Sequence, residues 1–149
     1  MKPLLVLLVT SGVALVALFY GTDQWNFDLA ARIGMAVMLV FTAIGHVAFT
    51  KGMVMMMPDF IPYKQAVVYA TGVIEVVTAV GLLVPATRVL MGWLLIVFFL
   101  LIIPANIKAA LQHVDYQKAT YDGNGTAYLW FRVPLQLFFI VWVYLSAIR

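Results

Sequence analysis

Five apolar runs, each close to the length needed to cross a bilayer, constrain this chain more than any other feature. A transmembrane helix needs about 20 mostly apolar residues to span about 30 Å of hydrocarbon. The runs show no alternating strand pattern, and backbone groups in lipid must be hydrogen-bonded internally, so we expect helices. The expected spans are residues 3–20, 33–50, 65–84, 89–111 and 129–148.

The composition also indicates that the protein lies in a lipid bilayer. Only 10% of the 149 residues are charged and 65% are hydrophobic, whereas a soluble domain carries about a quarter charged residues. We therefore predict one integral membrane domain over residues 1–149, an all-α transmembrane bundle in contact with lipid. The basic residues are scattered instead of grouped on one face with aromatics, which argues against a nucleic-acid partner.

The sequence contains no cysteine. This excludes disulfides, thiolate nucleophiles, dithiol chemistry and cysteine-bound Fe–S clusters. Any redox role must therefore use a bound cofactor or a partner subunit. The first run is longer than the apolar part of a signal peptide and ends at Tyr20 instead of a small-residue cleavage site, so we interpret it as a retained span.

The loops give a topology. Residues 85–88 are so few that the third and fourth spans must form an antiparallel hairpin. With the N-terminus inside, six of the nine Lys and Arg residues lie on the inner side, as expected when cytoplasmic loops are enriched in positive charge. We predict a multi-pass protein of the bacterial inner membrane with its N-terminus inside.

Glu75 is the main functional candidate within the spans. It lies near the middle of the third span, where an ionisable group is costly unless it is paired or neutralised. Thr71, Gly72, Thr78 and Ala79 are its neighbours at helical spacing, and small residues line helix–helix contacts in membranes. Glu75 is therefore expected to face the bundle.

The other polar side chains of the spans belong to the same half of the bilayer as Glu75. Following the chain back and forth places His46, Asn106, Arg132 and Gln136 toward loops 51–64 and 112–128. We predict a pocket open on that side, with Glu75 and His46 as catalytic groups. The expected ligand-binding residues are Arg132, Asn106, Gln136 and Tyr63.

Each of these residues also has a purely structural interpretation. Arg132 could reach the interface along its aliphatic stem, and Asn106 could bond to backbone carbonyls freed by Pro104. His46 could be an interfacial hydrogen-bonding group, and Gln136 could join helices. A buried pair that includes Glu75 could serve only to fix helix register.

Loop 51–64 is amphipathic and carries a methionine cluster, Met53, Met55, Met56 and Met57. Thioethers near His46 could hold Cu(I), but methionine at an interface more often provides adaptable packing, and we expect no metal. The longest loop, residues 112–128, contains Asp122-Gly123-Asn124-Gly125. This is a turn signal without the preceding acidic ligands of a calcium loop.

The order of motifs resembles the DoxX-like family of small integral membrane proteins, from about residue 30 to the C-terminus. The matching stretches are Gly45-His46-Val47-Ala48-Phe49, Met56-Met57-Pro58-Asp59-Phe60-Ile61-Pro62-Tyr63, Gly72-Val73-Ile74-Glu75, Gly81-Leu82-Leu83-Val84-Pro85, Pro104-Ala105-Asn106-Ile107 and Arg132-Val133-Pro134-Leu135-Gln136. The resemblance implies a four-helix core, here with an extra N-terminal span, and a characteristic glutamate at Glu75. It also implies that the protein is a membrane subunit that works with a quinone-linked oxidoreductase or a redox-stress complex.

Three functions remain open at this point. The first is a membrane subunit that binds a quinone- or lipid-like amphipathic molecule and acts with a redox partner. The second is a stand-alone membrane enzyme, such as an isomerase, that uses Glu75 and His46 as acid and base. The third is a non-catalytic assembly or scaffold subunit. A homo-oligomer is compatible with each of them.

Overall fold

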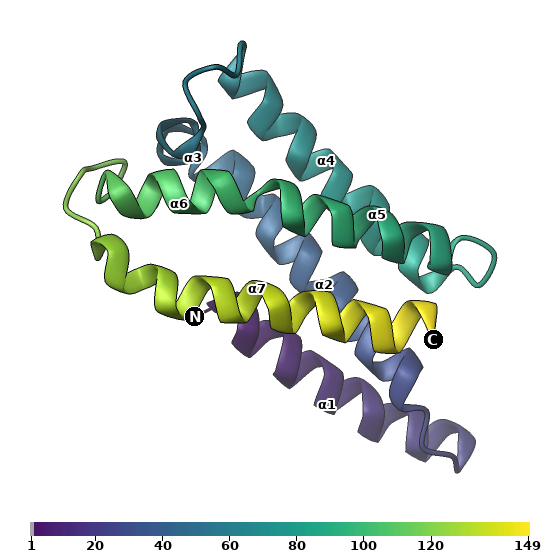
Figure 1. Ribbon diagram of the computed structural model, residues 1–149. Helices are drawn as coiled ribbons and strands as arrows, with labels where there is room; N and C mark the ends of the chain where they lie inside the picture. The colour runs from purple at the N-terminus through teal and green to yellow at the C-terminus, as the bar shows by residue number, and fades with distance from the viewer. Residues whose placement is uncertain (1) are drawn as a thin grey trace.

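The protein is a helical bundle with five stretches that are long and apolar enough to cross a membrane (Figure 1). The computed structural model describes residues 2–149. The first three of these stretches are α1, Lys2–Thr22, α2, Phe27–Ala48, and α4, Lys64–Leu83. The fourth joins α5, Arg88–Leu101, to α6, Ile103–Leu111, and the fifth joins η1, Gly125–Tyr128, α7, Leu129–Val143, and the π-helical turn η2, Tyr144–Ile148. These spans are compatible with a multi-pass membrane protein.

The helix that contains the second predicted span begins at Phe27, six residues before the predicted start of the span at residue 33. Asn26 caps the helix, because its side-chain oxygen accepts a hydrogen bond from the backbone N–H of Leu29 at 3.0 Å. Asp28 lies in the first turn, where a carboxylate favours the positive end of the helix dipole. The polar residues that we assigned to a loop therefore form the start of α2.

The fourth span is interrupted at Ile102, which was predicted to lie within a continuous helix. Pro104 follows at the beginning of α6, where its missing N–H removes one hydrogen bond of the helix ladder. The two helices still follow one another closely in Figure 1.

Part of the segment predicted as loop 51–64 is helical. The short helix α3, Thr50–Met56, contains three methionines of the cluster. It stops before Pro58, because a residue that precedes proline is driven out of the helical region, and Met57 is extended with ψ 139°.

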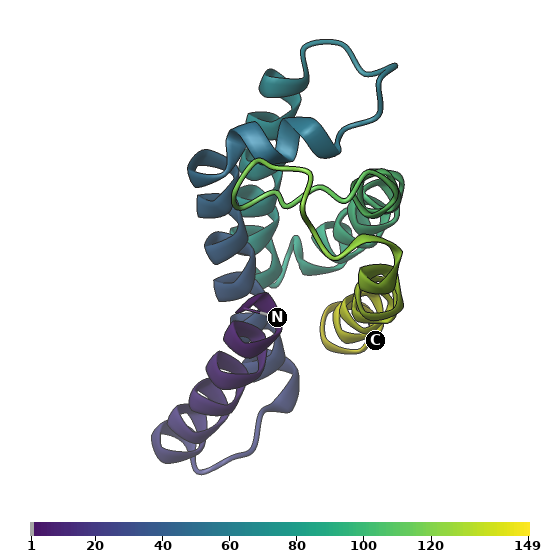
Figure 2. The same ribbon diagram turned by 90° about the vertical axis from the view of Figure 1, so that its left-hand side faces the viewer.

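The main helices converge at one end of the molecule. There α2, α5 and α7 all contact the terminal turn η2, whereas α2 contacts little of α7 itself. Figure 2 shows α2 and α4 on one side, α5–α6 and α7 on the other, and α1 against α2. The apolar core includes Leu39, Leu82, Leu95 and Val143. At the opposite end the main helices leave space that other segments of the chain cover.

That opposite end is covered by α3 and the loop between α6 and α7. A Cβ atom on Gly52 would collide with the backbone of Tyr116, so the two segments touch at a glycine. Asp59 accepts a hydrogen bond from Lys64 at 3.0 Å and another from Lys108 at 2.6 Å. Lys108 Nζ also donates to the Met57 carbonyl at 2.7 Å. These contacts tie the segment after α3 to α6.

Candidate functional site

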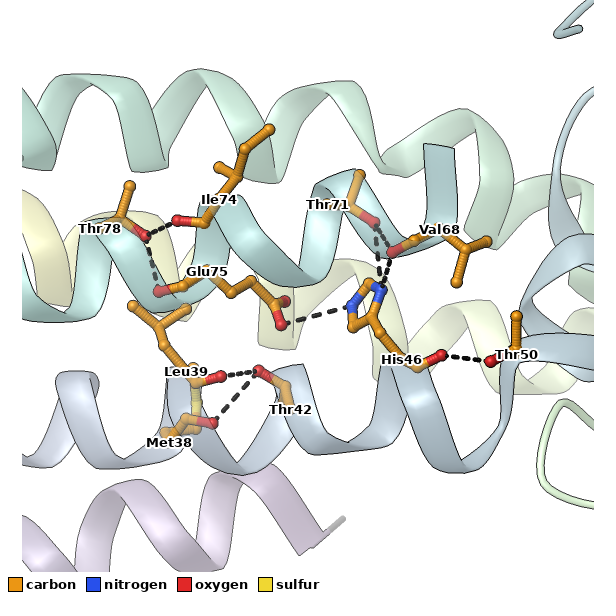
Figure 3. Close-up of polar contacts among 10 residues, drawn as sticks. All are labelled: Met38, Leu39, Thr42, His46, Thr50, Val68, Thr71, Ile74, Glu75 and Thr78. Carbon is orange, nitrogen blue, oxygen red and sulfur yellow. Dashed lines mark hydrogen bonds and ion pairs between the residues drawn. The ribbon is translucent and has the colours of Figure 1, made fainter. Parts of the chain in front are cut away.

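Glu75 and His46 form a buried pair between α4 and α2 (Figure 3). Glu75 is only 6% exposed, and its Oε2 lies 3.3 Å from His46 Nε2. Among residues 2–149, Oε2 has no aligned hydrogen-bond donor, so it approaches the imidazole as an ionic or proton-sharing partner. Glu75 therefore faces the bundle, as its small neighbours indicate.

The hydrogen bonds around the imidazole determine where its proton lies. His46 Nδ1 is 2.8 Å from the carbonyl oxygen of Val68, and because a carbonyl only accepts, Nδ1 must carry a hydrogen. Nε2 then has a proton only when His46 is the imidazolium ion. Two facing lone pairs would repel, so we expect one proton to lie between Nε2 and Oε2. The pair is neutral overall whether this proton is on nitrogen or on oxygen.

Two small features of α4 hold His46 in this position. Gly72 leaves room for the ring, since a Cβ there would lie 3.0 Å from His46 Cβ. Thr71 Oγ1 donates to the Val68 carbonyl at 2.8 Å and lies 3.1 Å from His46 Nδ1. The sequence marked Thr71 only as a small neighbour of Glu75. Its hydrogen bond to the imidazole depends on the approach of α2, which no local pattern reveals.

The remaining polar candidates form a second cluster on α6 and α7. Arg132 Nε donates to Asn106 Oδ1 at 3.4 Å, and Asn106 Nδ2 donates to Gln136 Oε1 at 3.2 Å. Gln136 Nε2 then donates to the carbonyl of Phe99 at 2.6 Å. Arginine only donates and a carbonyl only accepts, so both ends of the chain impose the same orientation on the two amides.

This series of hydrogen bonds changes the expected structural role of Asn106, which was to bond to a freed carbonyl. Gln136, not Asn106, supplies the hydrogen bond to a carbonyl beside the interruption between α5 and α6. Asn106 instead links Gln136 to Arg132. Gln136 is 4% exposed and joins α7 to α5, in line with its expected part in helix packing.

The two clusters meet at one cavity of about 150 Å³. His46 and Thr71 line it from α2 and α4, and Asn106 and Arg132 line it from α6 and α7. The rest of the wall is mostly apolar and comes from α1, α3, α4, α5 and α6, from the single residues that follow α3 and α5, and from the loop after α6: Pro3, Met53, Met56, Met57, Val68, Phe98, Ile102, Ala105 and Tyr116. Four of the polar groups thus share a cavity in the half of the bundle covered by α3 and the loop after α6, whereas Glu75 and Gln136 lie behind them and do not line it.

Tyr63 lies apart from the other predicted site residues. Its side chain is 86% exposed, and it lines a surface groove with Lys64, Gln65, Ala66 and Tyr69 instead of the cavity of His46 and Arg132. Its φ of 49° places it in the left-handed region just before α4, and the turn directs the ring outward. The catalytic or ligand-binding roles of all six residues remain predictions.

Comparison with known families identifies the chain at the level of a family. A family described as a domain of unknown function, DUF8561, matches residues 35–147. The chain therefore belongs to this family. The matched range runs from within α2 to η2 and includes none of α1. No curated protein and no solved structure matches the chain.

Proposed function

We propose that this DUF8561 protein binds a quinone- or lipid-like amphipathic molecule with its polar head in the cavity between His46 and Arg132. The observation that carries the proposal is the arrangement of the wall. The imidazole of His46, which is paired with Glu75, stands on one side and the guanidinium of Arg132 on the other, within a mainly apolar surface. Ligand pockets combine an apolar lining with a few placed polar groups.

The size of the cavity indicates which part of the ligand it holds. A volume of about 150 Å³ matches engineered protein cavities that accept benzene. It is smaller than the roughly 300 Å³ or more of pockets that enclose a whole drug-sized ligand. The cavity therefore suits a ring or a head group, and an apolar tail would extend beyond it into the bilayer.

We further propose that the protein acts with a redox partner if its ligand is a quinone. The chain has no cysteine, so it lacks the dithiol and cysteine-bound cluster chemistry that would move electrons by itself. The motif order, which resembles that of DoxX-like proteins, supports this view.

We also propose an orientation in the bacterial inner membrane with the cavity toward the cytoplasm. Figure 1 shows α3 and the loop after α6 at one end, and the α1–α2 and α4–α5 turns at the other. The first end carries Lys51, Lys64 and Lys118, whereas the second carries only arginines, among them Arg32 and Arg88. Cytoplasmic loops are enriched in positive charge, which supports this orientation.

A second candidate function rests on the His46–Glu75 pair. One shared proton between a buried carboxyl and an imidazole is an arrangement suited to acid–base catalysis. A stand-alone membrane enzyme that moves a proton on a hydrophobic substrate, such as an isomerase, would use it directly. Conversion of the bound molecule by the purified protein without any partner would favour this function over the redox subunit.

The binding proposal is tested by extracting the purified protein and identifying bound small molecules by mass spectrometry. Ala105 lines the cavity, so Ala105→Trp should fill it and remove the ligand. Ile107, two residues later on the same helix, is 39% exposed, and Ile107→Trp should leave the ligand in place. Equal ligand content in both variants, or none in the unsubstituted protein, would show that the cavity is not a binding site.

A further inference from the structure

Arg132 is the only cavity-lining residue among those described whose positive charge has no partner in the protein. Its guanidinium forms no ion pair with any carboxylate in residues 2–149, where the ion pairs are His46–Glu75, Lys64–Asp59, Lys108–Asp59 and Lys118–Asp115. Its one side-chain hydrogen bond goes to a neutral amide, Asn106, through Nε. The two terminal nitrogens of the guanidinium can therefore donate hydrogen bonds to a ligand.

The opposite wall does not supply the missing negative charge. Glu75 is paired with His46 at 3.3 Å and does not itself line the cavity. The Asn106–Gln136–Phe99 chain adds only neutral dipoles. The cavity therefore carries a net positive charge within a mainly apolar wall, and an unpaired charge in such surroundings is unfavourable.

A head group can reach Arg132 from the covered end of the bundle. Arg132 also lines a smaller hollow with Tyr116, Asn124 and Gly125, which belong to the loop after α6 and to η1. On its inner side Arg132 shares the main cavity with Met56 and Ile102. The guanidinium thus stands between a polar loop and an apolar wall, where an amphiphile has its own boundary between head and tail.

We infer that the ligand is an anionic amphiphile whose carboxylate or phosphate head group pairs with Arg132. The inference rests on the proposed function, because it names the ligand class of the same cavity. The planar guanidinium can bind either head group through two parallel hydrogen bonds. Nε stays on Asn106 and orients the side chain toward the cavity. The tail lies against the methionine side of the wall.

The test compares amphiphiles that differ only in their heads. Palmitate, hexadecyl phosphate and hexadecanol share a sixteen-carbon tail, and their binding to the purified full chain is measured in neutral detergent at about pH 8 by native mass spectrometry. We expect the two anions to bind about tenfold more tightly than the alcohol. Arg132→Gln should abolish this preference, and Arg132→Lys should retain part of it, because lysine keeps the charge without the planar fork.

Two control variants distinguish failure of this inference from failure of the proposed function. Arg88→Gln removes a positive charge at the other end of the bundle and should leave the preference intact. Ala105→Trp should prevent binding of all three amphiphiles. Equal binding of alcohol and anions by the unsubstituted protein would overturn the inference and keep the cavity as a binding site. Binding of none of them would overturn the inference, and the small molecules extracted from the unsubstituted protein would then decide whether the cavity is a binding site. A preference for one anion would decide between carboxylate and phosphate.

Discussion

The geometry of Glu75 and His46 predicts that the two side chains share one proton. His46 Nδ1 is committed to the Val68 carbonyl, so only Nε2 can exchange a proton with Glu75 across 3.3 Å. This arrangement keeps a carboxyl group inside the bundle without leaving a net charge there. Substitutions that test it must therefore distinguish the loss of the charge from the loss of side-chain volume.

Glu75→Gln should preserve the fold and remove the exchangeable proton. The glutamine amide has similar volume and can donate to a neutral Nε2, so we expect the free energy of unfolding to change by less than about 1 kcal/mol. Glu75→Ala should lower the free energy of unfolding by about 1–3 kcal/mol, because it leaves Nε2 of His46 unpaired and creates a gap in the packing.

Unfolding in mixed micelles measures both variants, and ¹⁵N NMR of the histidines reads the protonation state. Nδ1 of His46 should stay protonated in the unsubstituted protein and in Glu75→Gln, whereas Nε2 should be bare in the variant. The other histidine, His113, is assigned by substitution. A His46 ring that carries its hydrogen on Nε2 alone would contradict the shared proton.

At the scale of elements, the position of α3 depends on Gly52. A Cβ atom there would collide with the Tyr116 backbone, so Gly52→Ala should push α3 from the loop that it contacts. We expect it to lower the free energy of unfolding by about 1–3 kcal/mol. Gly45→Ala is the matched control, because it is also helical and its added Cβ would have its nearest neighbour at 3.7 Å. The control should be neutral or slightly stabilising, since alanine favours helix.

The segment after α3 should be held in a pH-dependent way. Hydrogen bonds from Lys108 and then Lys64 hold the pKa of the Asp59 carboxyl below its usual value. A carboxyl whose pKa is lowered by folding contributes stability above its unfolded pKa of about 3.9, and this contribution is lost as pH falls through the folded pKa. The ion pairs of Asp59 with Lys64 and Lys108 should therefore hold the segment in place at neutral pH and weaken only in acid.

A spin label on Phe60→Cys reports this loosening, because the chain has no other cysteine and Phe60 is 84% exposed. Its mobility at neutral pH should be low and should increase as the pH falls below about 4. In an Asp59→Asn background the label should be mobile at every pH. A label whose mobility is the same in both backgrounds would show that Asp59 does not hold the segment.

The elements that sequence reasoning found and missed differ in what stabilises them. The five spans follow from apolar length alone and could be predicted within a few residues. The start of α2 was missed because a single capping residue, Asn26, extends the helix into a polar segment. The helix α3 was missed because its position is fixed by a distant partner, Tyr116. Pro104 marked the interruption before α6, but a proline can also sit within a continuous membrane helix.

At the scale of the whole molecule, the side of the bundle that holds the polar residues could be predicted, but their grouping could not. Counting turns places His46, Glu75, Asn106, Arg132 and Gln136 in one half of the bilayer. Their separation into two clusters on opposite walls depends on where the helices converge, at η2. Tyr63 was predicted to bind the ligand, and the local turn directs it outward. Helix directions, which sequence patterns do not contain, decide the grouping of the polar residues, and the left-handed turn before α4 decides the position of Tyr63.

The proposed membrane topology gives the last prediction. An odd number of spans places the two ends of the chain on opposite sides, and the covered end of the bundle carries the lysine-rich loops. In intact bacterial spheroplasts, a membrane-impermeant thiol reagent should label Ala86→Cys, in the short α4–α5 turn, and spare Lys118→Cys, in the loop after α6. After lysis both should react, because both positions are exposed. Labelling of Lys118→Cys before lysis, with Ala86→Cys protected, would reverse the orientation and make the cavity of His46 and Arg132 open outward.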